Sequence, residues 1–194
     1  MVAIASLATA SLNKESGSGC WRSRRTRPAS NHAARLRRTI CALIGTGTLL
    51  VQPATAASNK VRVTSLTDVA FGTIANLNTD AIQSQSVCVY ADTSTNGYNV
   101  TATGTGAGGA FQLFSGAASI SYDVLWSSSA GQTSGAQLTP NVPLTGQVSG
   151  ATHQSCSNGP ATSASLVVVL RSTALSSAQA GTYSGTLTLV IGPE

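Results

Sequence analysis

Short apolar runs separated by clusters of glycine, serine, threonine and asparagine fill the chain from about residue 58 onward. In the clearest run, residues 182–191, apolar side chains alternate with hydroxyl-bearing ones. The apolar positions are Tyr183, Leu187, Leu189 and Ile191. Alternation with a period of two predicts a β-strand with one buried and one solvated face. Residues 166–170 are continuously apolar, which predicts a strand buried on both faces.

The same pattern predicts nine strands in all. They span residues 61–66, 69–74, 85–91, 98–103, 111–114, 119–126, 142–148, 165–171 and 182–191. Turn-forming sequences such as Asn96-Gly97 separate them. Residues 174–180 are expected to form at most a turn or two of helix. Short strands with turns at this spacing predict an all-β fold, an immunoglobulin-like β-sandwich without internal domain boundaries.

Residues 35–56 have the three parts of a secretory signal peptide. A basic stretch at residues 35–38 precedes an apolar stretch at residues 39–51, and small residues at 53–56 form a cleavage site. Cleavage is expected after Ala56, with Ala57 as the alternative. The apolar stretch is too short to cross a bilayer, so we expect no permanent membrane span.

Three segments are therefore expected. Residues 1–34 form an N-terminal extension, which is either disordered or the product of a misassigned start codon. Residues 35–56 form the signal peptide, and residues 57–194 form the exported β-sandwich domain. The extension is rich in serine and arginine and shows no apolar periodicity, so no element is predicted there.

The positive charge of the chain, +5 in total, lies in the leader. Residues 1–56 hold eight of the basic side chains and one acidic side chain, whereas residues 57–194 hold three basic and five acidic ones. Contacts with phosphate groups require a basic face, which three cations cannot build. The folded domain is therefore not expected to bind nucleic acid.

No group of residues in the domain predicts catalysis or metal binding. The lone histidine, His153, lies in a polar loop, and the sequence has no G-x-S-x-G nucleophile motif. The acidic residues are far apart, and no C-x-x-C or H-x-x-x-H spacing occurs. Residues 104–109 match G-x-G-x-x-G, but a strand-like run follows where a dinucleotide site needs a helix. We expect a protein that is not an enzyme and has no cofactor.

Two cysteines, Cys88 and Cys156, remain after removal of the leader. Export to an oxidising compartment favours a disulfide between them, with two buried free thiols as the alternative. A bond closing this loop stabilises the fold by about 4 kcal/mol in the chain-entropy view.

Several landmarks occur in a characteristic order behind the signal peptide. They are Phe71-Gly72, the cysteine strand 87–89, Tyr98-Asn-Val100, the aromatic strand 120–126 and the closing Ala-Gly-x-Tyr segment at 180–189. In this order they resemble the spore coat protein U domain family, which includes subunits of archaic (Csu-type) chaperone–usher pili. The resemblance covers residues 60–194. Gly185 stands where the family has an aspartate, and only about a dozen residues would precede Phe71 in the exported chain.

The resemblance implies an immunoglobulin-like sandwich that lacks its last strand. A periplasmic chaperone, and then the N-terminal segment of the next subunit, would fill the resulting groove. An outer-membrane usher and other pilus subunits are the further partners implied. On this interpretation the acceptor groove is lined by Tyr183, Leu187, Leu189 and Ile191. Val61 and Val63 would be the donor side chains. The alternative is that all six are ordinary core residues; no further strand follows Ile191 in this sequence to cover that edge.

The expected function is that of a secreted structural or adhesive subunit of a fimbrium, with a role in attachment or biofilm formation. Such a subunit passes through the periplasm and ends at the cell surface. The alternative is a free-standing secreted β-sandwich that binds a ligand or forms a coat, with Trp126 and Tyr122 as contact residues. A hydrolase using His153 is the least favoured interpretation.

Overall fold

The computed structural model describes residues 2–7 and 59–194. The predicted signal peptide, residues 35–56, lies outside the described residues, as does most of the N-terminal extension. One part of the extension is described, and it forms a strand that the sequence pattern did not predict.

The described residues form thirteen strands and two short helical segments. The strands are β1 (Val2–Leu7), β2 (Lys60–Thr64), β3 (Gly72–Ile74), β4 (Ala81–Asp92), β5 (Gly97–Thr103), β6 (Gln112–Ser115), β7 (Ala118–Ser121), β8 (Asp123–Ser127), β9 (Ala136–Gln137), β10 (Leu144–Val148), β11 (Ala164–Leu170), β12 (Thr182–Gly185) and β13 (Thr188–Pro193). The helical segments are a 3₁₀ turn, η1 (Ala107–Gly109), and α1 (Ser172–Ser177).

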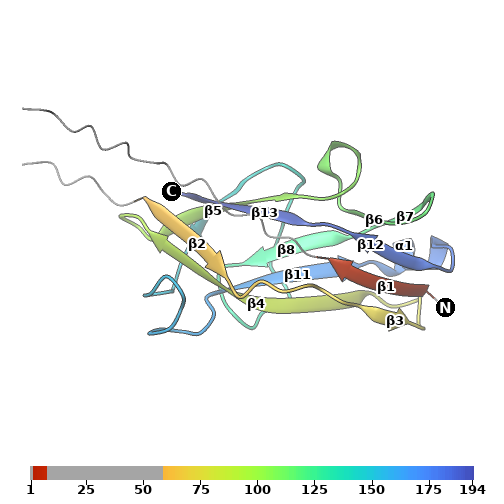
Figure 1. The fold of residues 1–194 in the computed structure, drawn as a ribbon, viewed down its shortest axis with the longest axis horizontal. Coiled ribbons are helices and arrows are strands. Elements are labelled where there is room, and N and C mark those ends of the chain that lie inside the picture. The colour runs from red at the N-terminus through yellow and green to blue at the C-terminus, as the bar shows by residue number, and fades with distance from the viewer. Residues whose placement is uncertain (1, 8–58) are drawn as a thin grey trace, which may run out of the picture. The chain divides into compact units, whose positions relative to one another are not determined.

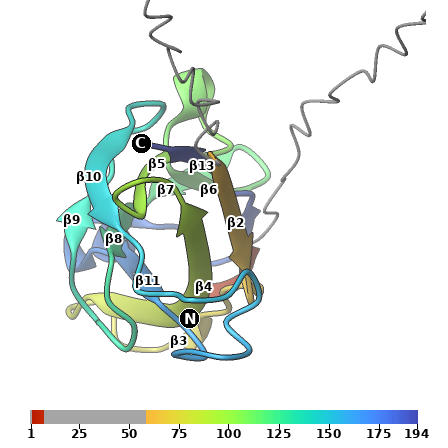
Figure 2. The same cartoon turned by 90° about the vertical axis from the view of Figure 1, so that its left-hand side faces the viewer.

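The strands form two layers. One layer is a sheet in the order β2-β4-β11-β8-β9, and the other contains two sheets, β10-β5-β13 and β3-β1-β12-β6-β7. Figure 1 shows β5, β13, β12 and β6 along one side, and β8, β11 and β4 along the other. In the end-on view of Figure 2 the strands enclose an interior, with β10 on one side and β2 on the other. The predicted all-β sandwich is confirmed.

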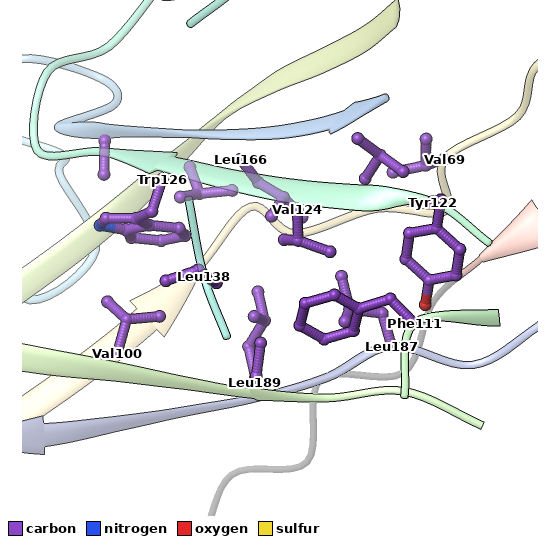
Figure 3. Close-up of a cluster of buried hydrophobic side chains, with 14 of the residues drawn as sticks. Val69, Val100, Phe111, Tyr122, Val124, Trp126, Leu138, Leu166, Leu187 and Leu189 are labelled. Atoms are coloured by element: carbon purple, nitrogen blue, oxygen red, sulfur yellow. The ribbon is translucent and has the colours of Figure 1, made fainter. Parts of the chain in front are cut away.

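Apolar side chains from both layers meet in the interior. β11 lies between β4 and β8, and all seven of its residues are buried, as its continuous apolar run predicts. Trp126 packs edge-on against Tyr98, with ring centroids 6.5 Å apart, and its indole N–H donates a hydrogen bond to the Tyr98 hydroxyl at 3.2 Å. Figure 3 shows Trp126 among aliphatic side chains of this core.

Two long predicted strands are each divided in the structure. Residues 119–126 become β7 and β8, which belong to different layers, and Tyr122 lies at the crossing. Its ring stacks on Phe111 at a centroid distance of 5.6 Å. Its hydroxyl is buried and has no hydrogen-bond partner among the described residues, and burial raises the pKa of this phenol.

The other divided strand is residues 182–191, which become β12 and β13. At the break, Thr186 donates its backbone N–H to the Thr105 hydroxyl at 2.6 Å, and that hydroxyl donates to the Thr186 carbonyl at 3.0 Å. A side chain therefore replaces the partner strand at the point where the segment passes from one sheet to the next. Alternation of side chains along one segment does not reveal such a change of partner.

The structure contains the disulfide that the sequence predicts, between Cys88 and Cys156, with Cα atoms 6.0 Å apart. Cys88 lies between Val87 and Val89 of the core, so its side chain points to the opposite face of β4. There it packs with Ala151 in a small separate cluster. The disulfide thus anchors the loop before β11 onto the outer face of the sandwich.

Replacing Cys88 and Cys156 together by serine is expected to lower the free energy of unfolding by about 4 kcal/mol. The reason is that the disulfide joins residues 68 positions apart and restricts the unfolded chain. Urea denaturation of the full chain measures this change. A loss below about 1 kcal/mol would show that the loop entropy is offset by strain in the native bond.

Arg171 links three elements at one end of the sandwich. Its guanidinium contacts the Asp80 carboxylate at 2.9 Å and the Asp123 carboxylate at 2.7 Å. The second oxygen of Asp80 accepts the backbone N–H of Ser172, at the start of α1, at 2.8 Å. This backbone hydrogen bond, followed by the bond from Arg171, lowers the pKa of Asp80 below its ordinary value of 3.8.

The pKa of Asp80 is lower in the folded than in the unfolded state. The ionised carboxylate therefore stabilises the fold fully above pH 3.8, and this stabilisation is lost as the pH falls through the pKa that Asp80 has in the folded protein. We expect Asp80→Asn to remove this contribution, so that the stability of the variant falls less steeply with acidification below about pH 4. The midpoint of thermal unfolding, measured for both proteins at several pH values between 6 and 2.5, tests this prediction. Parallel stability curves for the wild type and the variant would contradict the assignment.

Candidate functional site

A slot for one strand lies between β3 and β12, and β1 occupies it. β1 runs antiparallel to β3, with Val2 opposite Ile74 and Ile4 opposite Gly72. It runs parallel to β12, with Ile4 opposite Tyr183. In Figure 1 the red strand β1 lies beside the C-terminal blue strands, although it comes from the opposite end of the chain. The slot is thus filled by a strand that lies outside the continuous segment 59–194.

Local features fix the two walls of the slot. β12 is positioned by Tyr183, whose side chain is fully buried and whose hydroxyl donates to the Gln179 carbonyl at 3.0 Å. On the other side, β3 begins at Gly72 with φ of +65°, a left-handed conformation in which glycine carries no steric penalty. Ile74 at the end of β3 is buried in the core. β12 also pairs with β6, whereas β1 is the only strand that pairs with β3 among the described residues.

An apolar pocket continues the slot beyond the end of β1. It is small, with an open volume of about 10 Å³, which is room for about one water molecule. The pocket is lined by Leu66, Thr67, Val69, Gln85, Leu166, Leu187 and Leu189. Since β1 is parallel to β12 and ends opposite Gly185, Leu187 and Leu189 lie further along the direction in which β1 runs. Figure 3 shows Val69 and Leu166 across from these two leucines.

The wall of the pocket that precedes β3 is held by one glutamine. The Gln85 carbonyl oxygen accepts the backbone N–H of Thr67 at 2.9 Å, and its amide nitrogen donates to the Thr67 carbonyl at 3.0 Å. These paired bonds mimic the pairing of a strand. They hold Leu66 and Val69 opposite Leu187 and Leu189.

One backbone edge of β13 has no paired strand among the described residues, and β2 lies within 8 Å of β13 without pairing with it. β13 pairs with β5 along one edge, from Thr188 opposite Thr103 to Pro193 opposite Tyr98. Among the described residues, no strand pairs with its other edge. The slot therefore has a filled part beside β12 and an unfilled part beside β13.

The structure places the four predicted groove residues on the inner face, and all four are buried. Tyr183 lies beside the filled part of the slot, and Leu187 and Leu189 line the pocket. Ile191 is opposite Val100 on β13 and is not among the residues that line the pocket. Three of the four residues therefore adjoin the slot.

The predicted donor residues require a correction. Val61 and Val63 lie in β2, which pairs with β4 of the same sandwich, and Val63 is 5% exposed. In this structure they belong to the first strand of their own domain, which the sequence offers as the alternative to a donor strand. The strand that fills the slot, β1, lies in residues 1–34, where the sequence analysis predicts no element. The alternation Val2-Ala3-Ile4 was the available signal.

The alternative ligand-binding residues are also buried. Trp126 is 1% and Tyr122 is 3% exposed, so neither offers a contact surface. His153 lies in an exposed loop, where its Nδ1 is 2.8 Å from the Ser157 hydroxyl and 3.0 Å from the Ser155 hydroxyl. These are contacts within one loop.

Within residues 2–7 and 59–194 there is no group of three or more histidine, cysteine or acidic side chains placed to hold a metal ion. No helix within these residues is long and apolar enough to cross a membrane.

The sequence matches no protein-family model and no curated protein. The resemblance to the spore coat protein U family therefore rests on its sequence motifs. One similar solved structure is that of a chaperone-tip adhesin complex, described as vital for synergistic activation of CFA/I fimbriae biogenesis. The similarity has a TM-score of 0.45 at 16% identity and covers 70% of this chain. This chain spans only 41% of the chain it matches there.

We expect Gln85→Ala to release the pocket wall at Thr67, because both backbone bonds to the side-chain amide are lost. Backbone amides of residues 66–69 should exchange with deuterium faster, and stability should fall by about 1 kcal/mol. Gln83→Ala, at an exposed position of the same strand, is the matched control. Unchanged exchange at residues 66–69 in the Gln85 variant would show that the wall is held by its apolar contacts alone.

Proposed function

We propose that this chain is a secreted structural or adhesive subunit of a chaperone–usher pilus, and that it assembles by donor-strand complementation. The observation that carries the proposal is the slot between β3 and β12, which is filled by a strand from outside residues 59–194. Its partners are a periplasmic chaperone, an outer-membrane usher and neighbouring subunits. The protein acts at the cell surface, in attachment or biofilm formation, without catalysis or a cofactor.

The physical basis is the state of the domain when the slot is empty. Backbone groups along β3 and β12 then lack partners, and the apolar side chains beneath them meet water. Exposed strand edges with apolar neighbours associate readily with another strand. Addition of an extended segment provides main-chain hydrogen bonds for affinity and pockets for side-chain specificity. The strand edges of the slot offer the main-chain hydrogen bonds, and Leu187 and Leu189 line the pocket for a side chain.

A free-standing secreted β-sandwich, acting as a binding or coat protein, is the second candidate. The observation in its favour is that a strand of the same chain, β1, fills the slot beside β12. A chain closed in this way does not need another subunit. Its contact surface would lie away from the buried Trp126 and Tyr122.

The pilus proposal predicts that Leu66→Asp prevents assembly. Leu66 is half-buried in the pocket wall, and a carboxylate there must lose water when a strand covers the pocket. We expect at least roughly tenfold less assembled protein, which corresponds to about 1.4 kcal/mol or more. Val190→Asp is the control, because Val190 is 53% exposed on the outer face of β13.

Assembly is measured on the exported protein from its native host, by size-exclusion chromatography of periplasmic and surface fractions with mass spectrometry of bound proteins. The wild type and Val190→Asp should be recovered as oligomers or bound to a chaperone. A circular dichroism spectrum shows whether Leu66→Asp is folded. An exported wild type that is a stable monomer without partners contradicts the proposal and favours the free-standing protein.

A further inference from the structure

We propose that Asn158 is a site of self-modification, at which the backbone nitrogen of Gly159 displaces the side-chain amide and leaves aspartate or isoaspartate. The modification does not depend on the proposed function. Its basis is that the sequence contains two Asn-Gly pairs, Asn96-Gly97 and Asn158-Gly159, which the structure holds in opposite ways. In such a pair the attacking nitrogen belongs to a residue without a side chain, so its approach is unhindered.

The pair Asn158-Gly159 is open to solvent and free to react. Both residues are exposed, in the loop that joins β10 to β11. Among the described residues, no hydrogen bond engages the Gly159 N–H or the Asn158 side-chain amide. The contact that Asn158 makes uses its backbone carbonyl, which accepts the Thr152 hydroxyl at 3.4 Å. The amide and the attacking nitrogen can therefore meet by rotation within an exposed loop.

The pair Asn96-Gly97 is held in place. Gly97 is buried at the start of β5, and its N–H donates a hydrogen bond to the Thr93 hydroxyl at 2.8 Å. The Asn96 N–H donates to the Thr93 carbonyl at 3.2 Å, and its carbonyl accepts the Ser149 N–H at 2.9 Å. The nitrogen of Gly97 has to lose its hydrogen bond through local opening before it can attack, so this pair is expected to react slowly.

The reaction needs water as its only co-reactant. A bond forms between the Gly159 nitrogen and Cγ of Asn158, the bond from Cγ to Nδ2 breaks, and ammonia leaves with the proton of the Gly159 N–H. The product is a cyclic imide. Water that adds at Cγ opens the ring to aspartate, whereas water that adds at the backbone carbonyl gives isoaspartate, in which the chain runs through the former side chain. Nothing is oxidised or reduced.

The loop can accept this change because it is anchored on both sides of the reacting pair. On one side, Cys156 is bonded to Cys88. On the other, Ser163 donates its backbone N–H to the Val87 carbonyl at 2.8 Å. The longer backbone of isoaspartate falls between these anchors, in residues 157–162. The reaction also adds a sixth acidic group to a domain that has five, so it makes a more acidic protein with the same fold.

The test incubates the purified full chain in warm, mildly alkaline buffer. After reduction and digestion with chymotrypsin, mass spectrometry measures the fraction of asparagine lost at each pair, and peptide fragmentation distinguishes aspartate from isoaspartate. We expect conversion at Asn158 to be at least about tenfold faster than at Asn96, which corresponds to about 1.4 kcal/mol for local opening at Gly97. Ion-exchange chromatography should separate an acidic form whose thermal unfolding midpoint equals that of the fresh protein.

Two variants test the structural reasons for this difference. Asn158→Gln lengthens the side chain beyond easy ring closure and should abolish the acidic form. Thr93→Ala removes the acceptor of the Gly97 N–H, so it should accelerate conversion at Asn96 and leave Asn158 unchanged. Thr95→Ala, at an exposed position of the same turn, is the matched control and should change neither rate.

Conversion at Asn158 that is no faster than at Asn96 would overturn the inference, as would an acidic form that persists in Asn158→Gln. A lower unfolding midpoint for the acidic form would overturn the claim that the change is confined to the tip of the loop.

Discussion

The arrangement depends on backbone hydrogen bonding across the gap between β3 and β12. Each edge carries N–H and C=O groups that need partners, and β1 lies between them and pairs with both. Open strand edges of this kind readily pair with another strand, and the proposed function rests on this tendency. Tyr183 of β12 is fully buried beside β1, whereas Leu187 and Leu189 are 3% and 1% exposed although β1 ends before them.

Several contacts of the domain do not involve this strand. The disulfide fixes the loop before β11 to β4, and Arg171 joins Asp80 and Asp123 at one end. Gln85 holds the wall of the pocket. The central strand β11 is paired on both edges and buried on both faces. These contacts hold together the sheet that contains β11 and the loops beside it.

Sequence patterns predicted the sandwich, the disulfide and most strands, because alternation and turn residues are local signals. They predicted the inner face of residues 182–191 for the same reason. They did not predict which strand lies beside which, and so Val61 and Val63 were assigned to a donor strand although β2 pairs with β4. The change of sheet at Tyr122 and the role of Val2–Leu7 also depend on contacts between distant parts of the chain, which no local pattern contains.

The most direct measurement of the central claim is an experimental structure of the exported protein after removal of its leader. The account predicts that a strand from another chain occupies the position between β3 and β12 and extends along the free edge of β13 over the pocket. Direct pairing of β3 with β12, in a monomer that has closed the gap by itself, would contradict it.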